Sequence, residues 1–281
     1  MAIEAPQIAL MGGGYTLTKV AQRLKPGSFV ITSRSAAQCA EWQALGWVSQ
    51  RLSLEESESV VSFFKAYPEL TVLVDSVPPL REAVDRTMGV KRVVHALATT
   101  KITRVIYLST TGVFGVRDGS IVDESTAPAP WNPQGEARYL SELAYRSSGK
   151  MVTALRLPAI YGPGRSMVDS VINGTYRMVG DGESWSNRIH VEDLVSIIIS
   201  AVEALELPEV LCVSDDHPAR VRDVLSFICA REGVPFPAYI SEQEALRAGS
   251  YTRLSNQIIK NDLMKKLLAI TLRYPSYREG L

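Results

Sequence analysis

Two glycines near the N-terminus have the spacing of a strand-to-helix turn that binds phosphate. Gly12 and Gly14 follow an apolar run and precede an amphipathic one, so they occupy the first two glycine positions of a G-x-G-x-x-G turn. The first glycine allows a tight turn, and the second lets a pyrophosphate approach the helix N-terminus, where unpaired N–H groups and the helix dipole favour negative charge. This pattern predicts a dinucleotide site, with Tyr15 and Thr16 beside the phosphates.

Leu17 occupies the third glycine position of the motif. A glycine there normally allows the helix to pack closely on the strand, so we expect this helix to lie farther out or to tilt. Glycine clusters also serve as plain strand-to-helix turns. The place of this turn in the first strand–helix unit of an alternating chain favours a nucleotide site.

The end of the second predicted strand carries a cation where an NAD site would carry a carboxylate for the ribose hydroxyls. Residues 31–35 have the sequence ITSRS. The planar guanidinium of Arg34 suits a 2′-phosphate, assisted by the hydroxyls of Thr32, Ser33 and Ser35. This favours NADP(H) over NAD(H). The alternative is an exposed arginine at a helix start.

Apolar β-branched runs alternate with runs of helical spacing along the first half of the chain. The predicted strands are residues 8–11, 28–33, 47–50, 71–77, 104–110 and 151–157, and the predicted helices between them are residues 16–24, 36–46, 56–67 and 81–100. This alternation predicts an α/β fold with a doubly wound parallel Rossmann sheet, covered by helices on both faces.

The regular alternation of predicted strands and helices ends after about Arg156, where loop-forming sequences and longer gaps between predicted elements begin. We therefore expect residues 1–157 to form a dinucleotide-binding domain. Residues 158–281 are expected to form mainly a small C-terminal substrate lobe, with segments at about 187–213 returning to the first domain. Ligands of such sheets bind at the carboxyl ends of the strands.

The composition excludes several classes of function. The 281 residues include 30 basic and 30 acidic side chains with no long basic run, so neither nucleic acid nor a membrane surface is an expected partner. The apolar run 194–202 is far short of the ~20 residues that a spanning helix needs. Three widely spaced cysteines predict reduced thiols and no metal site, and the N-terminus has no secretory signal, so we expect a cytoplasmic location.

Three further stretches follow the glycine turn in a characteristic order. They are YLSTTGVFG at residues 107–115, LRLPAIYGPGR at 155–165 and NRIHVEDLV at 187–195, and the chain ends in LRYPSYREGL. Together they make the whole chain resemble the extended short-chain dehydrogenase/reductase family, the NAD-dependent epimerase/dehydratase group, in a short atypical branch. The resemblance implies a Rossmann sheet, a bound NAD or NADP and a substrate lobe of nucleotide-sugar type.

Family chemistry begins with hydride transfer at the nicotinamide, assisted by a tyrosine base, a serine or threonine hydroxyl, and a lysine four residues after the tyrosine. The resemblance places the catalytic hydroxyl at Thr110, with Thr111 beside it on the substrate side. A hydroxyl here can hydrogen-bond a substrate carbonyl or alcohol. The alternative is a strand-end hydroxyl that satisfies backbone groups.

The tyrosine and the lysine are where this sequence departs from the family pattern. Alignment on Glu142 puts Gln134 at the tyrosine position and Arg138 at the lysine position, and a shift by one residue gives Gly135 and Tyr139 instead. Neither frame supplies the pair. The guanidinium of Arg138 can bind ribose hydroxyls or a substrate carboxylate, but no phenol precedes it.

Three side chains are candidates to replace the missing base. Tyr139 would need a distorted first helical turn to reach the site, Tyr161 lies in a loop that in the family passes near the nicotinamide, and His190 has a near-neutral intrinsic pKa with Asp193 close enough to orient it. Each has a structural alternative. His190 and Asp193 match a segment that packs the lobe and caps a helix, and Tyr161 sits beside turn-forming residues.

The resemblance also assigns neighbours of the ligands. Val77 and Pro78 end a strand where the family backbone contacts the adenosine ribose, and Pro158 is placed beside the cofactor. Arg165 and Arg177 are candidate substrate ligands, since guanidinium groups bind phosphate, and the alternative for Arg177 is packing within the lobe.

Two functions remain open. One is an NAD(P)-dependent oxidoreductase or epimerase/dehydratase with an atypical acid/base, and the other is a non-catalytic NADP(H)-binding sensor or scaffold. Either would take a small-molecule partner, for which the resemblance implies a nucleotide sugar. By analogy with the family, a homodimer would form through the helices at residues 81–100 and 135–148.

Overall fold

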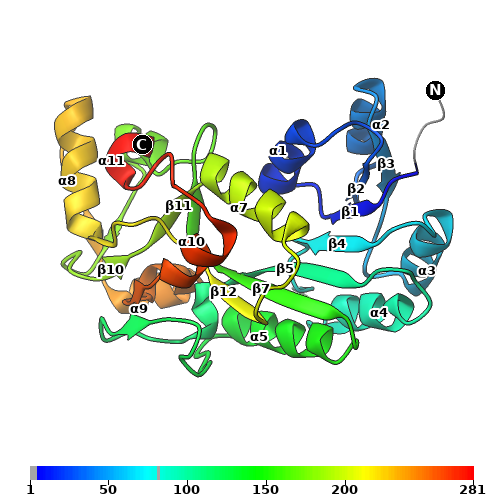
Figure 1. The fold of residues 1–281 in the computed structure, drawn as a ribbon. Helices are drawn as coiled ribbons and strands as arrows, with labels where there is room; N and C mark the ends of the chain where they lie inside the picture. The colour runs from blue at the N-terminus through cyan, green and yellow to red at the C-terminus, as the bar shows by residue number, and fades with distance from the viewer. Residues whose placement is uncertain (1–4, 81–82) are drawn as a thin grey trace. The chain divides into compact units, whose positions relative to one another are not determined.

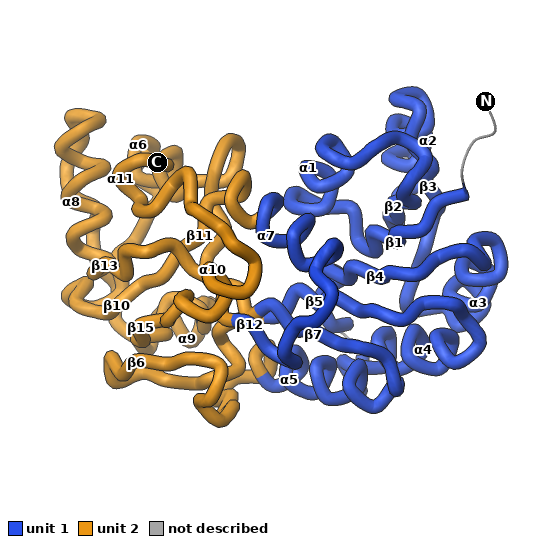
Figure 2. Tube along the Cα trace, viewed as in Figure 1, with its two compact units in different colours: residues 1–109, 136–155, 195–211 blue, residues 110–135, 156–194, 212–281 orange. Residues whose placement is uncertain are grey.

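The computed structural model describes residues 5–80 and 83–281, which divide into two compact units. Unit 1 contains the described residues of 1–109, 136–155 and 195–211, and unit 2 contains residues 110–135, 156–194 and 212–281 (Figure 2). Each unit is therefore assembled from segments that lie far apart in the sequence.

A seven-stranded parallel sheet is the centre of the Rossmann-type fold (Figure 1). Its strand order is β12-β7-β5-β4-β1-β2-β3. The strands are β1 (Ile8–Met11), β2 (Phe29–Ser33), β3 (Val48–Arg51), β4 (Val72–Asp75), β5 (Arg104–Thr110), β7 (Met151–Leu157) and β12 (Val210–Cys212). The predicted α/β fold with a doubly wound parallel sheet is confirmed.

The register of the central strands explains why they are apolar along their whole length. Leu10 of β1 lies opposite Ile31 of β2 and Val74 of β4, and all three side chains are fully buried. Strands of a parallel sheet are covered on both faces, so every side chain along them needs to be apolar.

Helices fill the connections between the strands. They are α1 (Tyr15–Arg23), α2 (Ala36–Ala44), α3 (Ser57–Ala66), α4 (Met88–Leu97), α5 (Pro133–Arg146) and α7 (Val191–Glu203). The buried faces of α3 and α4 join one core with Tyr107 of β5 and Tyr145 of α5, whose ring centroids lie 5.2 Å apart.

One predicted helix is shorter than expected, and one observed strand was not predicted. The helix expected at residues 81–100 begins only at Met88, since the Asp85 carboxylate accepts hydrogen bonds from the N–H and hydroxyl of Thr87 and holds a turn there. Arg81 and Glu82 of that expected helix lie outside the described residues. The short strand β12 was not among the predicted strands, because three apolar residues are too short a run to identify.

The helix expected at residues 135–148 begins earlier, at Pro133. The side-chain oxygen of Asn132 accepts from the backbone N–H groups of Gln134 and Gly135 at 3.1 and 3.0 Å. An asparagine cap followed by proline is a favourable helix start, because proline lacks an N–H that would need a partner.

Unit 2 has short strand pairs and its own core. Its strands are β6 (Ile121–Val122), β8 (Ala159–Tyr161), β9 (Met178–Val179), β10 (Trp185–Ser186), β11 (Arg188–His190), β13 (Ala219–Arg220), β14 (Tyr239–Ile240) and β15 (Ile258–Ile259). Its helical segments are the short 3₁₀ segments η1 (Thr111–Val113) and η2 (Tyr251–Leu254) and the helices α6 (Val168–Ile172), α8 (Val221–Glu232), α9 (Glu242–Arg247), α10 (Asp262–Leu268) and α11 (Tyr277–Gly280). One core of this unit packs Val224, Leu225 and Ile228 of α8 against Met178 and Tyr277.

The cysteines are free thiols, as predicted. Cys39 and Cys212 are buried and Cys229 is half-buried. No helix within residues 5–80 and 83–281 has the length and apolarity to span a bilayer.

The glycine turn packs through its middle glycine rather than through the position of Leu17. A Cβ on Gly13 would lie 2.3 Å from the Trp42 ring and 2.8 Å from Ile31, whereas a Cβ on Gly14 would meet nothing closer than the carbonyl of Gly12 at 4.0 Å. Leu17 itself is fully buried in the core. Close packing of the turn against Ile31 of β2 and Trp42 of α2 therefore depends on Gly13.

We expect Gly13→Ala to lower the free energy of unfolding by about 1–3 kcal/mol, because the added methyl overlaps two buried side chains. Gly14→Ala is the matched control, and its free energy of unfolding should change by less than about 0.5 kcal/mol. Urea unfolding of both variants measures the difference. Equal unfolding midpoints for the two variants would contradict this packing.

Candidate functional site

The glycine turn is fixed by the strands on either side of it. Gly12 has φ of 86°, and its N–H donates to the hydroxyl of Thr32 at 3.1 Å while its carbonyl accepts from the hydroxyl of Ser76 at 2.6 Å. A Cβ on Gly12 would lie 2.9 Å from a methyl group of Val77. Only glycine combines this conformation with this close approach.

The side of the turn at Gly14 is open. Gly14 is exposed and precedes the first residue of α1, Tyr15, which is half-buried, while Thr16 is buried. The first N–H groups of an α-helix have no partners within the helix. The backbone here thus leaves the space that an approaching phosphate requires, so these residues fit the dinucleotide expected from the sequence.

Two arginines lie at the ends of neighbouring strands beside this turn. Arg34 is exposed and pairs with Glu55 at 3.7 Å. Arg51, which the sequence analysis did not identify, lies opposite Ser33 in the register and donates from Nε to the carbonyl of Arg34 at 3.2 Å. The signal in the sequence is a basic residue directly after the predicted strand at residues 47–50.

The hydroxyls expected to assist Arg34 already have backbone partners. Thr32 is buried and holds Gly12, Ser33 accepts from the N–H of Ser35 at 3.2 Å, and Ser35 caps α2 by accepting from the N–H of Gln38. A hydroxyl that accepts from an N–H keeps its own hydrogen available for a phosphate oxygen.

Arg138, at the family's lysine position, is tied to the ends of two strands. Its Nη1 donates to the carbonyl of Val77 at 3.2 Å, to the carbonyl of Leu108 at 3.1 Å and to the hydroxyl of Tyr107 at 3.0 Å. A guanidinium has five N–H donors in a planar fork, so one nitrogen can bind the backbone while the others remain for a ligand. Pro78, next to Val77, is exposed.

A buried carboxylate that the sequence analysis did not identify supports the same loop. Asp75 is fully buried at the end of β4, where it accepts from the hydroxyl of Tyr145 at 2.6 Å and from the N–H of Val77 at 2.8 Å. Burial raises the pKa of Asp75 to about 6, although both hydrogen bonds and the charge of Arg138 oppose the shift. The signal in the sequence is an aspartate that ends an apolar strand.

The threonines of unit 2 make backbone contacts. The hydroxyl of Thr110 accepts from the N–H of Gly112 at 3.1 Å and so caps the short helical turn η1. Thr111 is buried, and its carbonyl accepts from the side-chain amide of Gln257 at 3.1 Å. The Thr110 hydroxyl is half-buried rather than enclosed, which leaves its hydrogen able to reach a ligand.

The packing of the first turn of α5 shows whether the family's tyrosine would fit at position 134 or at position 135. A Cβ on Gly135 would lie 2.6 Å from the carbonyl oxygen of Gly112, so no tyrosine fits there. Gln134 is exposed and Tyr139 is half-buried. The position of Gln134 is therefore the one that could accommodate the family's tyrosine, and it carries none.

Tyr161 and His190 pack within unit 2. The Tyr161 hydroxyl donates to the carbonyl of Ser276 at 3.2 Å, and the His190 ring lies 5.2 Å from the Tyr161 ring and 3.7 Å from that of Tyr274. Burial raises the pKa of the Tyr161 hydroxyl well above its ordinary value, the opposite of what a phenolate base requires. The carboxylate of Asp193 accepts from the N–H groups of Arg273 and Tyr274 at 2.8 and 2.9 Å.

The remaining substrate candidates lie in loops of the same unit. Arg177 is exposed and donates to the carbonyls of Gly174 and Tyr176 at 2.7 and 2.8 Å. Arg165 is exposed and pairs through its backbone with Gly162, and Pro158 is half-buried directly after β7. Within the described residues, no group of three or more histidine, cysteine, aspartate or glutamate side chains could hold a metal ion.

Comparison with known proteins places these features in a family. The sequence model of the NAD dependent epimerase/dehydratase family matches residues 13–213. Protein YeeZ of Escherichia coli K12 is 26% identical over 224 residues, which cover 76% of this chain and 80% of that protein.

Solved structures have the same fold. A conserved protein of unknown function from Silicibacter pomeroyi is 27% identical, with a TM-score of 0.76 over 97% of this chain and 95% of that chain. UDP-glucuronic acid 4-epimerase from Bacillus cereus, in complex with NAD, has a TM-score of 0.78 at 16% identity, over 97% of this chain and 95% of that chain. The second comparison is a likeness of fold alone.

The raised pKa of Asp75 makes stability depend on pH. The folded state disfavours the ionised carboxylate, so the stability of the folded state is full below the ordinary pKa of 3.8 and falls as pH rises through about 6. Relative to Asp75→Asn, the wild type should lose up to about 3 kcal/mol over that range, since each pKa unit corresponds to about 1.4 kcal/mol.

Urea unfolding at about pH 4.5 and about pH 7.5 measures about 2 kcal/mol of this loss, since the first part of it falls below pH 4.5. Asp181→Asn, which removes an exposed carboxylate, is the control and should leave the pH dependence unchanged. Parallel pH profiles for the wild type and Asp75→Asn would contradict the assignment.

Proposed function

Because this chain belongs to the NAD-dependent epimerase/dehydratase family, we propose that it binds a nicotinamide dinucleotide in unit 1 and prefers NADP(H) to NAD(H). The observation that carries the proposal is the glycine turn, in which Gly12 is held by Thr32 and Ser76 while Gly14 faces open space. The pyrophosphate would lie at the start of α1, beside Tyr15 and Thr16.

The preference for NADP(H) is assigned to the end of β2. Arg34 is exposed there with Arg51 beside it, and a 2′-phosphate would replace the weak, solvent-exposed ion pair with Glu55. A guanidinium binds phosphate through two parallel hydrogen bonds, and the hydroxyls of Ser33 and Ser35 add further donors. Val77, Pro78 and Pro158 remain the proposed neighbours of the rest of the cofactor.

The bound dinucleotide would supply hydride acceptance or donation at its nicotinamide ring. Arg138 would hold the nicotinamide ribose through the donors that it does not use on Val77, Tyr107 and Leu108. Thr110 would hydrogen-bond a substrate oxygen. Tyr139 is the phenol left for proton transfer near α5, since the raised pKa of Tyr161 suits it to packing.

The substrate proposed for unit 2 is a small molecule of the nucleotide-sugar class. The support is the fold shared with UDP-glucuronic acid 4-epimerase and the set of polar side chains that unit 2 contributes, namely Thr111, Arg165, Arg177 and His190. A homodimer formed through α4 and α5 is also proposed, and the half-exposed Leu140 and Leu143 of α5 support it.

The second candidate is a non-catalytic NADP(H)-binding sensor or scaffold. The observation that favours it is the loss of the tyrosine at the position of Gln134, together with the binding of Arg138 to two backbone carbonyls. A cation held in this way keeps a binding function without a phenol to activate.

NADPH should raise the melting temperature more than NADH does, because selective binding to the native state stabilises it. In Arg34→Ala the NADPH affinity should fall about 10- to 100-fold and the NADH affinity should stay unchanged, since only the 2′-phosphate loses its charged partner. Thermal unfolding and isothermal titration calorimetry with both nucleotides measure these effects.

Two controls accompany this experiment. Arg247→Ala removes an exposed arginine of α9 and should leave both affinities unchanged, whereas Gly14→Ala should weaken both nucleotides by blocking the approach of the pyrophosphate. If neither nucleotide shifts the melting temperature at near-millimolar concentration, the cofactor proposal is wrong.

Restoring the tyrosine–lysine pair of the family should restore turnover of substrate. The double variant Gln134→Tyr, Arg138→Lys should turn over a sugar nucleotide at least about 100-fold faster than the wild type, the gain typical of general acid–base catalysis. The nicotinamide absorbance band follows the reaction. Arg138→Lys alone is the matched control, since it changes the cation without adding a phenol, and turnover by the wild type at the rate of the double variant would contradict the proposal.

A further inference from the structure

A buried carboxylate of unit 1 has hydrogen bonds but no cation bound to it. Asp75 ends β4 and is fully buried. Its Oδ1 accepts from the N–H of Val77 at 2.8 Å, and its Oδ2 accepts from the hydroxyl of Tyr145 at 2.6 Å. No lysine, arginine or histidine within residues 5–80 and 83–281 forms an ion pair with it. A buried carboxylate of this kind is sensitive to any charge that is placed near it.

Strand β5 and helix α5 place titratable side chains beside Asp75. Tyr107 of β5 lies opposite Asp75 in the strand register, and Met11 of β1, which is apolar, lies opposite it on the other side. From α5 come the phenol of Tyr145 and the guanidinium of Arg138. The charge of Arg138 favours the ionised carboxylate, but its Nη1 donates to the hydroxyl of Tyr107 and to backbone carbonyls. The negative charge of Asp75 is therefore only partly balanced.

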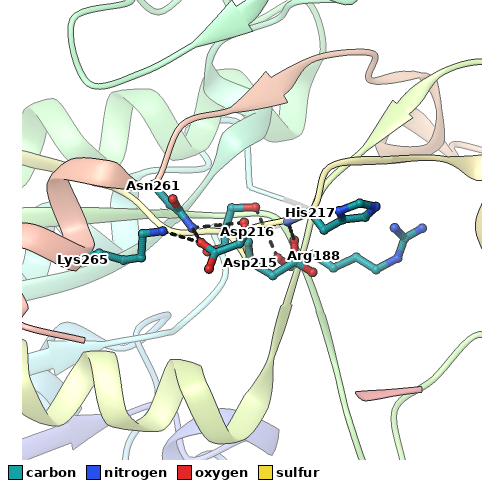
Figure 3. Close-up of polar contacts among 7 residues, drawn as sticks. Arg188, Asp215, Asp216, His217, Asn261 and Lys265 are labelled. Atoms are coloured by element: carbon teal, nitrogen blue, oxygen red, sulfur yellow. Dashed lines mark hydrogen bonds and ion pairs between the residues drawn. The ribbon is translucent and has the colours of Figure 1, made fainter. Parts of the chain in front are cut away.

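Two neighbouring aspartates of unit 2 show the contrast between a paired and a buried carboxylate. Asp216 is exposed and pairs with Lys265 at 2.6 Å (Figure 3). Asp215 is buried, and burial raises its pKa to about 7, although the charge of the nearby Arg188 opposes the shift. Burial raises the pKa of Asp75 to about 6 in the same way. Asp75 therefore exchanges a proton close to neutral pH.

The peptide that Asp75 holds borders the glycine turn. A Cβ on Gly12 would lie 2.9 Å from a methyl group of Val77 and 3.1 Å from its backbone nitrogen, which is the donor to Asp75. The hydroxyl of Ser76 donates to the carbonyl of Gly12 at 2.6 Å. A pyrophosphate at the start of α1 would therefore bring negative charge near the buried carboxylate. Like charge and the exclusion of water both disfavour an ionised carboxylate.

Protonation leaves the Val77 peptide in place. A neutral carboxyl group carries its hydrogen on one oxygen and still accepts on the other. With the hydrogen on Oδ2, the bond to Tyr145 reverses, because a phenol can accept as well as donate. Oδ1 keeps the N–H of Val77 in both states. Loss of the charge therefore does not require the turn to change its shape.

We propose that Asp75 is a positioning residue of the dinucleotide site and takes up a proton from solvent when a pyrophosphate binds at the glycine turn. The proton converts the carboxylate to the neutral acid. The affinity for the dinucleotide is then full below the pKa of the free protein, about 6, and falls as the pH rises through that value. The inference rests on the proposed function because it needs a dinucleotide in unit 1, but it needs neither the preference for NADP(H) nor turnover.

Isothermal titration calorimetry with NADH, in two buffers that differ in their enthalpy of ionisation, counts the protons taken up. NADH is the probe because it lacks the 2′-phosphate, and a phosphate monoester itself ionises near neutral pH. A rise of about half to one unit in the pKa of Asp75 gives an uptake of about 0.25–0.5 proton at about pH 6.5. The NADH affinity should then fall about 2- to 5-fold from about pH 6 to about pH 8.

Asp75→Asn imitates the protonated carboxyl, since its amide can accept from Val77 and donate to the hydroxyl of Tyr145. This variant should bind NADH without proton uptake, and at about pH 8 it should bind NADH more tightly than the wild type does. A merely structural role of Asp75 predicts weaker binding instead. Tyr145→Phe removes a hydrogen bond that favours the ionised form, so it should move the uptake to higher pH, and it serves where Asp75→Asn does not fold.

Asp215→Asn is the matched control, because it removes another buried carboxylate whose described hydrogen bond lies within unit 2, and it should keep the proton uptake of the wild type. NADPH should show the same difference between the wild type and Asp75→Asn, since its 2′-phosphate contributes equally to both. Binding of NADH or NADPH without this difference would overturn the inference and leave the proposed function standing. Absence of binding by both nucleotides rejects the proposed function and the inference with it.

Discussion

The hydrogen bond from the Val77 N–H to the buried Asp75 carboxylate fixes the peptide on which the glycine turn and Arg138 both depend. The carbonyl of the same Val77 accepts from Arg138, and its side chain closes on Gly12. The phenol of Tyr145 holds the carboxylate from the other side. One loop after β4 thus supports both the glycine turn and the guanidinium of Arg138 in α5, so a change at Asp75 is expected to affect both.

Arg138 replaces the lysine of the family pattern, and the two cations differ in how they are held. A lysine presents a single ammonium, whereas Arg138 reaches two strand-end carbonyls and the hydroxyl of Tyr107 with one nitrogen. That arrangement makes Arg138 part of the scaffold of unit 1. It gives the site rigidity at the cost of the proton relay that a tyrosine–lysine pair provides, and the exposed Gln134 does not replace that relay.

Local signals predicted most of the fold. The strands at residues 8–11, 104–110 and 151–157 were predicted with their observed bounds, because an apolar run between turn residues carries the information by itself. Gly12 was assigned correctly to a tight turn for the same reason. The start of α5 was predicted at residue 135 and lies at Pro133, where Asn132 caps the helix.

The site was less predictable where its partners are distant in the sequence. Tyr145 lies 70 residues from Asp75, and the packing of Gly13 depends on Trp42 of a different helix. No local pattern shows that Arg188 is buried. The residues RIHV alternate polar and apolar side chains, which predicts a strand with one exposed face. The family resemblance supplied positions for Arg138 and Thr110, but their contacts follow from how the sheet is assembled.

The contacts of residues 273–277 have a consequence for folding during synthesis. Tyr277 belongs to a core of unit 2, Ser276 accepts from Tyr161, and Arg273 and Tyr274 are held by Asp193. These late residues complete packing that earlier segments leave unfinished. Because residues 273–277 follow their partners in the chain, unit 2 cannot close this core until they have left the ribosome, and a nascent chain stalled before residue 273 would expose apolar surface to chaperones.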